Sequence, residues 1–152
     1  MESIAVSLPK PQSSQAVPGA RAARYGGRTL SGIAIAFLGF DAAVKVLLVP
    51  QVVEASAKLG FSASTVFNLG VILLASVLLY AYPRTSVLGA VLLTGYLGGA
   101  IATHVKLGDP LFSHVLFPLY VALFVWGGLF LRDGRLRALL PVAREIPVQQ
   151  RS

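Results

Sequence analysis

Five polar side chains stand inside segments that are otherwise apolar, and they are the residues of this sequence best placed to do chemistry. They are Asp41, Lys45, Asn68, His104 and His114. A spacing of four residues places Asp41 and Lys45 on one helix face, with the acid before the base, the favourable order for an ion pair. Histidine exchanges protons near neutral pH and can donate or accept a hydrogen bond. The five residues are therefore candidates for ligand binding or proton transfer, with no catalytic role assigned.

Each of these residues also has a purely structural interpretation. An isolated charge in hydrocarbon costs about 2.5–3.5 kcal/mol on insertion scales, so Asp41 and Lys45 can serve only to neutralise each other, with Lys45 extending toward the headgroups. The two histidines can be interfacial residues in contact with water, and Asn68 can hydrogen-bond to a neighbouring helix. No metal site is expected, because a metal ion would need more ligands at closer spacing.

Composition indicates that these residues lie in a membrane. The chain has 152 residues, of which 55% are hydrophobic and 12% charged, whereas globular domains carry about 25% charged residues. It contains no cysteine, which excludes disulfides, thiol nucleophiles and cysteine-ligated metal centres. The net charge is +7, but the basic residues flank apolar runs and form no base-reading face, so no nucleic-acid partner is expected.

Four apolar segments are each close to the roughly 20 residues with which a helix crosses a bilayer. They cover residues 29–49, about 65–82, 86–107 and 111–131. Short turns rich in proline and glycine separate the last three, so those helices must run antiparallel. We therefore predict an all-α fold, a four-helix transmembrane bundle with up-down topology over residues 29–134.

The remaining segments are predicted to lie outside the bundle. Residues 1–28 and 135–152 are expected to be flexible basic tails, and residues 51–64 to hold a short amphipathic helix along the interface. Arginines concentrate on one side of the predicted bundle, against only Lys58 and Lys106 on the other, which places both termini in the cytoplasm. The arginines on that side are Arg21, Arg24, Arg28, Arg84, Arg132, Arg135, Arg137 and Arg144. The expected location is a cytoplasmic membrane, bacterial by the compactness of the chain.

The predicted orientation brings all five polar candidates into the outer half of the membrane. Asp41 lies about 16 Å into the first span at 1.5 Å per residue, and we expect it to border one outward-facing polar recess with Lys45, His104 and His114. Pro118 has no amide hydrogen, so a kink is expected near His114.

Small residues form stripes opposite the polar faces of the first and third spans, including Gly95 and Gly99. Two arrangements stay open. Either the polar faces converge on a cavity while the stripes pack neighbouring spans, or the stripes build the bundle core and the polar side chains reach the interface.

A longer pattern resembles a known family. The run TGYLGGAIATHVKLGDPLFSHVLFPLYVALFVWGGLFLRD, together with SGIAIAFLGFDAAVKVL in the first span and the four-span layout, resembles the DoxX-like membrane protein family over about residues 29–140. The resemblance implies a small four-helix integral membrane protein. Some members are subunits of quinone-linked sulfur oxidation, and others accompany oxidoreductases or assist assembly. Because this chain lacks cysteine, thiol chemistry of any member does not carry over.

Three kinds of function remain open on this basis. The first is an accessory or ligand-binding subunit of a membrane redox system, which binds quinone or lipid and associates with other membrane subunits or with copies of itself. The second is a stand-alone membrane oxidoreductase. The third is a small transporter or assembly factor, and a transporter would have to oligomerise because four spans leave little room for a pathway.

Overall fold

The computed structural model describes residues 18–134 and 136, and these form an all-helical bundle. The elements are α1 (Pro18–Val46), α2 (Pro50–Lys58), α3 (Ala63–Ala81), α4 (Ser86–Leu107), a π-helical turn η1 (Leu111–Val115) and α5 (Phe117–Arg132). Four stretches are long and apolar enough to cross a membrane, namely residues 22–46, 63–81, 86–107 and 111–132. The predicted all-α bundle with four spans is confirmed.

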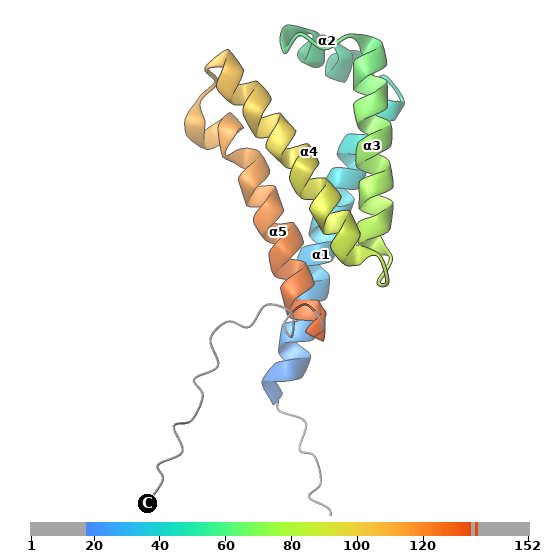
Figure 1. Ribbon diagram of the computed structural model, residues 1–152, viewed down its shortest axis with the longest axis vertical. Helices are drawn as coiled ribbons and strands as arrows, with labels where there is room; N and C mark the ends of the chain where they lie inside the picture. Colours follow the sequence, from blue (N-terminus) through green and yellow to red (C-terminus); the bar gives the residue numbers. More distant parts are fainter. Residues whose placement is uncertain (1–17, 135, 137–152) are drawn as a thin grey trace, which may run out of the picture.

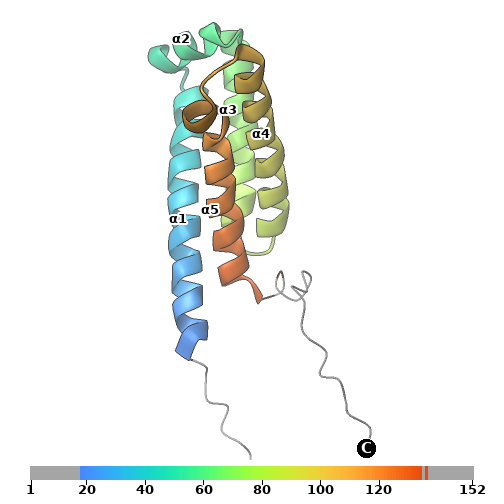
Figure 2. The ribbon, with the colours of Figure 1, turned by 90° about the vertical axis from the view of Figure 1, so that its left-hand side faces the viewer.

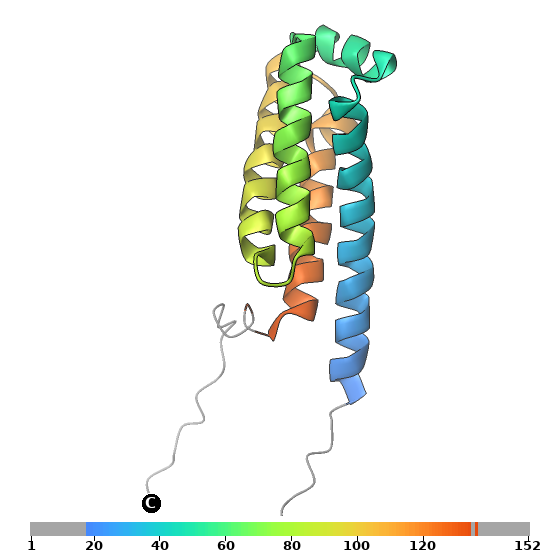
Figure 3. The same ribbon diagram turned by 90° about the vertical axis from the view of Figure 1, so that its right-hand side faces the viewer.

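The four spans form a closed ring. Helix α1 packs against α3 and α5, and α4 packs against the same two helices from the other side, so α1 and α4 are diagonal. Figures 1 and 2 show that α1 begins and α5 ends at the same end of the bundle, which we call the tail end. The short helix α2 and the connection from α4 to α5 lie at the opposite end, which we call the loop end (Figure 3).

Local sequence explains where the spans begin and end. Ser62 caps α3, because its hydroxyl accepts a hydrogen bond from the Thr65 amide at 3.3 Å. Gly108 ends α4 in the left-handed conformation, with φ of 70°. The fourth predicted span is interrupted as expected near Pro118: a π-type bond of 2.9 Å joins the Leu116 amide to the Leu111 carbonyl, and α5 starts one residue later.

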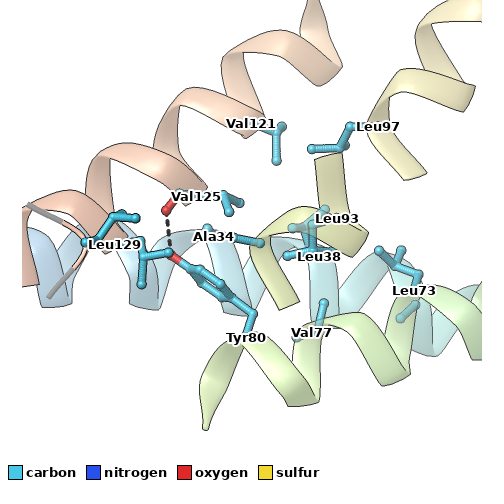
Figure 4. Close-up of a cluster of buried hydrophobic side chains, with 13 residues drawn as sticks. Ala34, Leu38, Leu73, Val77, Tyr80, Leu93, Leu97, Val121, Val125 and Leu129 are labelled. Atoms are coloured by element: carbon cyan, nitrogen blue, oxygen red, sulfur yellow. Dashed lines mark hydrogen bonds between the residues drawn. The ribbon is translucent and has the colours of Figure 1, made fainter. Parts of the chain in front are cut away.

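The core sits where the spans approach most closely, toward the tail end, and Tyr80 is its largest buried side chain. Its hydroxyl lies 2.9 Å from the Ser31 hydroxyl and donates to the Val125 carbonyl at 2.8 Å (Figure 4). One side chain thus ties α3 to both α1 and α5. Because lipid tails are as apolar as the core, close packing and hydrogen bonds of this kind hold spans together.

Helix α1 starts earlier than the sequence predicts. The tail expected over residues 1–28 is wrong for residues 18–28, which belong to α1; residues 1–17 lie outside the described chain. Proline suits the first turn of a helix, and Gly27 packs so closely on α5 that an added Cβ would lie 2.7 Å from the Arg132 amide nitrogen. The tail predicted over 135–152 also lies outside the described residues, except that Leu136 is buried in the core cluster.

Neither arrangement expected for the small-residue stripes is found in full. An added Cβ on Gly32, Gly95 or Gly99 would meet nothing within 4 Å, so these stripes neither pack on neighbouring spans nor build the core. Close helix contact uses other glycines instead: a Cβ on Gly128 would lie 2.6 Å from the Ser31 hydroxyl. Helix α1 buries a different face, formed by Ser31, Ala34, Leu38 and Ala42.

Candidate functional site

A cavity of about 720 Å³ lies within the loop end of the bundle. All four spans and α2 contribute to its wall, and most of the lining side chains are apolar, such as Val66 of α3 and Val121 of α5. Ligand pockets in proteins typically measure about 300–1,000 Å³. The cavity is therefore large enough for an organic ligand.

Asp41 and Lys45 both line this cavity from α1. The Lys45 ammonium donates a hydrogen bond to an Asp41 carboxylate oxygen, and both groups are partly buried. The helix spacing alone brings them together, as the sequence indicates. Because the two charges neutralise each other, the pair can stand on a mostly apolar wall, and its remaining donors and acceptors are available to polar atoms of a ligand.

His104 lines the same cavity from α4, and Asp109 holds its ring in place. The Nδ1 atom of His104 lies 2.6 Å from an Asp109 carboxylate oxygen. The left-handed turn at Gly108 directs the chain back over the end of α4, where the Asp109 amide also donates to the His104 carbonyl at 3.1 Å. With Nδ1 facing a carboxylate, Nε2 accepts a hydrogen bond when the ring is neutral and donates one when it is charged.

The remaining two predicted residues are placed differently. His114 is exposed beside His104, with ring centroids 5.7 Å apart, and its Nδ1 lies 2.8 Å from the Ser113 hydroxyl. It is not part of the cavity wall. Asn68 is exposed on α3 and also lies outside that wall. The polar recess expected from the sequence therefore contains Asp41, Lys45 and His104, with His114 next to it and Asn68 apart from it.

Reasoning from the sequence missed several residues that line the cavity or contact its wall. Asp109 was read only as part of a turn, although a carboxylate five residues after a histidine, just past a helix-ending glycine, is a usable signal. Tyr96 lines the wall about two turns before His104 along α4. Helix α2 covers the cavity with Val52, and Leu59 directly after the helix also lines it; this segment was expected only to lie along the interface.

The wall reaches the surface of the bundle between α3 and α4. Gly95 and Gly99 of α4 and Ile72 of α3 line the cavity and are also exposed; the Ile72 side chain is 55% exposed. Figure 1 shows the two helices close together at their short tail-end turn and further apart toward the loop end. Because glycine has no side chain, Gly95 and Gly99 leave this side of the cavity open toward lipid.

The described residues, 18–134 and 136, hold no group of three or more His, Cys, Asp or Glu side chains arranged for a metal ion. The cavity wall suits a ligand with an apolar body and a small polar head, because the polar residues are few and the apolar wall is extensive.

Comparison with known protein families matches residues 29–128 to the DoxX-like family, which is more than half of the chain. The matched region includes Asp41, Lys45, His104 and His114. No curated protein and no solved structure matches the chain. The family match and the four apolar helices together make this a multi-pass membrane protein. The chain belongs to the DoxX-like family.

Proposed function

We propose that this protein is an accessory, ligand-binding subunit of a membrane redox system and that its loop-end cavity takes a lipid-soluble quinone. One observation carries the proposal: His104, held by Asp109, stands on the wall of a mostly apolar cavity that is open toward lipid between α3 and α4. A quinone combines a flat ring, two carbonyl acceptors and an apolar tail. The cavity matches each of these features.

The polar groups on the wall suit the ring of such a ligand. His104 Nε2 would donate to a quinone carbonyl in its charged form and accept from a quinol hydroxyl in its neutral form. Lys45 and Tyr96 line the same wall and carry further donors. The apolar tail would leave past Gly95 and Gly99 into the bilayer, so the head could bind without drawing the whole molecule out of lipid.

A subunit role follows from the kinds of side chain present. Histidine, aspartate and lysine bind and transfer protons, whereas electron transfer in proteins depends on cofactors. In this proposal the electrons come from a partner subunit, and the chain supplies a binding site, orientation of the head and a proton-exchanging group. A redox partner in the same membrane is therefore part of the proposal.

The first experiment measures decylubiquinone binding to the purified protein in detergent. Trp126 is the single tryptophan, and its indole nitrogen donates to the Thr94 hydroxyl at 2.9 Å, next to Gly95 on α4. Quinones quench tryptophan fluorescence, so quenching reports occupancy. We expect saturable quenching, weakened about tenfold by His104→Phe, as for loss of one hydrogen bond to a charged group.

Asn68→Leu provides the matched control. Asn68 is polar and lies in the loop-end half of the bundle, as His104 does, but it is outside the cavity wall. This variant should bind decylubiquinone as the unmodified protein does. Quenching that rises linearly without saturation, or that is equal in His104→Phe and Asn68→Leu, would overturn the proposal.

A further inference from the structure

A second cavity, of about 350 Å³, lies at the tail end and shares no lining residue with the first. Its wall consists of Arg28, Pro83, Arg84, Ser86, Arg132 and Asp133. Half of these residues are arginines, and they come from α1, from the turn between α3 and α4, and from the last residue of α5. The fold thus gathers three guanidinium groups that are far apart in the sequence.

The charge of this tail-end cavity favours an anion. Three guanidinium groups and one carboxylate leave an excess of two positive charges. Arg132 is held in position, because it donates to the Tyr80 carbonyl at 3.0 Å and its guanidinium lies 4.8 Å from the centre of the Tyr80 ring. A guanidinium held in this way needs little further ordering when it binds an oxyanion, and its planar fork matches phosphate oxygens.

The start of α4 adds to the positive electrostatic potential of the tail-end cavity. Ser86 is the first residue of this 22-residue helix and lines the cavity. The preceding Thr85 makes no side-chain cap, since its hydroxyl donates instead to the Leu79 carbonyl at 2.8 Å. The first amides of a helix carry partial positive charge. They reinforce the arginines here and do not make the site by themselves.

The depth of this cavity in the membrane indicates which anion it meets. It lies where α3 ends at Ala81, α4 begins at Ser86 and α5 ends at Arg132. These are the boundaries of three apolar spans, and the phosphate groups of phospholipids lie at that level of a bilayer. We infer that the tail-end cavity binds the phosphate of an anionic phospholipid, with Arg28 and Arg84 as the exposed contacts and Arg132 as the fixed one.

The test compares two lipids with the same acyl chains. Native mass spectrometry of the full-length protein would measure retention of dioleoyl phosphatidic acid and of dioleoyl phosphatidylcholine. We expect clear preference for phosphatidic acid. Each basic residue near a membrane surface contributes about fivefold in affinity, so Arg28→Gln and Arg84→Gln should each weaken retention about fivefold, and the double variant about 25-fold.

Lys106→Gln is the matched control, because it removes one positive charge at the loop end of the bundle. It should retain phosphatidic acid like the unmodified protein. Arg28 and Arg84 are both exposed, so their variants should keep the melting temperature of the bundle. If their melting temperatures fall, the test uses the unmodified protein and the charge-conserving Arg84→Lys variant instead. Both should prefer phosphatidic acid to phosphatidylcholine.

Three results would overturn the inference. The first is equal retention of the two lipids, and the second is equal retention of phosphatidic acid by the double variant and by Lys106→Gln. The third is displacement of phosphatidic acid by millimolar inorganic phosphate together with phosphate binding to delipidated protein, which would make this a site for a free ion. Retention that resists inorganic phosphate supports the headgroup as the source.

Discussion

His104 and Asp109 are joined across the left-handed turn at Gly108, with the imidazole Nδ1 2.6 Å from a carboxylate oxygen. This contact fixes which ring nitrogen is turned away from the carboxylate. A carboxylate on one ring nitrogen fixes the orientation of the imidazole, as it does for histidines at metal sites.

Replacing Asp109 with alanine should weaken decylubiquinone binding about tenfold, because the His104 ring loses the charged partner that orients it. The bundle should stay folded, since Asp109 lies in a connection and not in a span. Fluorescence titration of Trp126 would measure the affinity. Glu54→Ala is the control, because Glu54 is an exposed acid on α2 outside the cavity wall. Equal affinities of the two variants would contradict a role for Asp109.

Asp41 and Lys45 should be energetically coupled. Removing one leaves a partly buried charge without its partner, at a cost of about 1–3 kcal/mol, whereas Asp41→Leu with Lys45→Leu removes both charges. Thermal unfolding in detergent should therefore show each single variant to be less stable than the double variant. Simple addition of the two single losses would show that the residues depend on different partners.

The opening between α3 and α4 can be tested at one glycine. Gly99→Leu should slow and weaken quinone binding without loss of stability, because an added Cβ meets nothing within 4 Å and the new side chain stands at the cavity wall. Gly98→Leu is the control, since Gly98 is equally open but lies outside that wall. If stopped-flow quenching gives one rate for both variants, the ligand does not pass between these helices.

How far the sequence predicts this structure depends on which contacts decide each feature. The spans follow from local information, because apolar runs of sufficient length are separated by proline and glycine, and α4 covers the third expected span of about 86–107. The Asp41–Lys45 pair also follows from spacing alone. Which face of a helix is buried does not, since it depends on partners such as Ser31, Tyr80 and Val125, which are dozens of residues apart.

The candidate site likewise combines features set by local sequence with features set by packing between distant residues. His104 was found as a polar residue in an apolar span, but its partner Asp109 depends on the direction the chain takes after Gly108. Asn68 was named as a candidate from its depth in the span, and the rotation of α3 leaves it exposed. Depth in a span is readable from residue number, whereas rotation about the helix axis is set by packing against the other helices.

Packing at the core should be most sensitive at Gly128. Alanine there would place its Cβ 2.6 Å from the Ser31 hydroxyl and 2.8 Å from the Ser31 amide nitrogen, and overpacking of this kind costs about 1–3 kcal/mol. The melting temperature should fall. Gly127→Ala is the neighbouring control, because its Cβ meets nothing within 4 Å. Similar melting temperatures for the two variants would show that α1 and α5 are not held at this distance.

The orientation of the bundle is the last prediction, and the absence of native cysteine makes it direct to test. Arg28, Arg84 and Arg132 all line the tail-end cavity, and cytoplasmic flanks are enriched in arginine and lysine, so we expect the tail end inside the cell. Ala57→Cys on α2 and Gly134→Cys beyond α5 are exposed positions at opposite ends. An impermeant maleimide applied to intact cells should label only the first. Labelling of Gly134→Cys alone would invert the topology and place the loop-end cavity in the cytoplasmic half of the membrane.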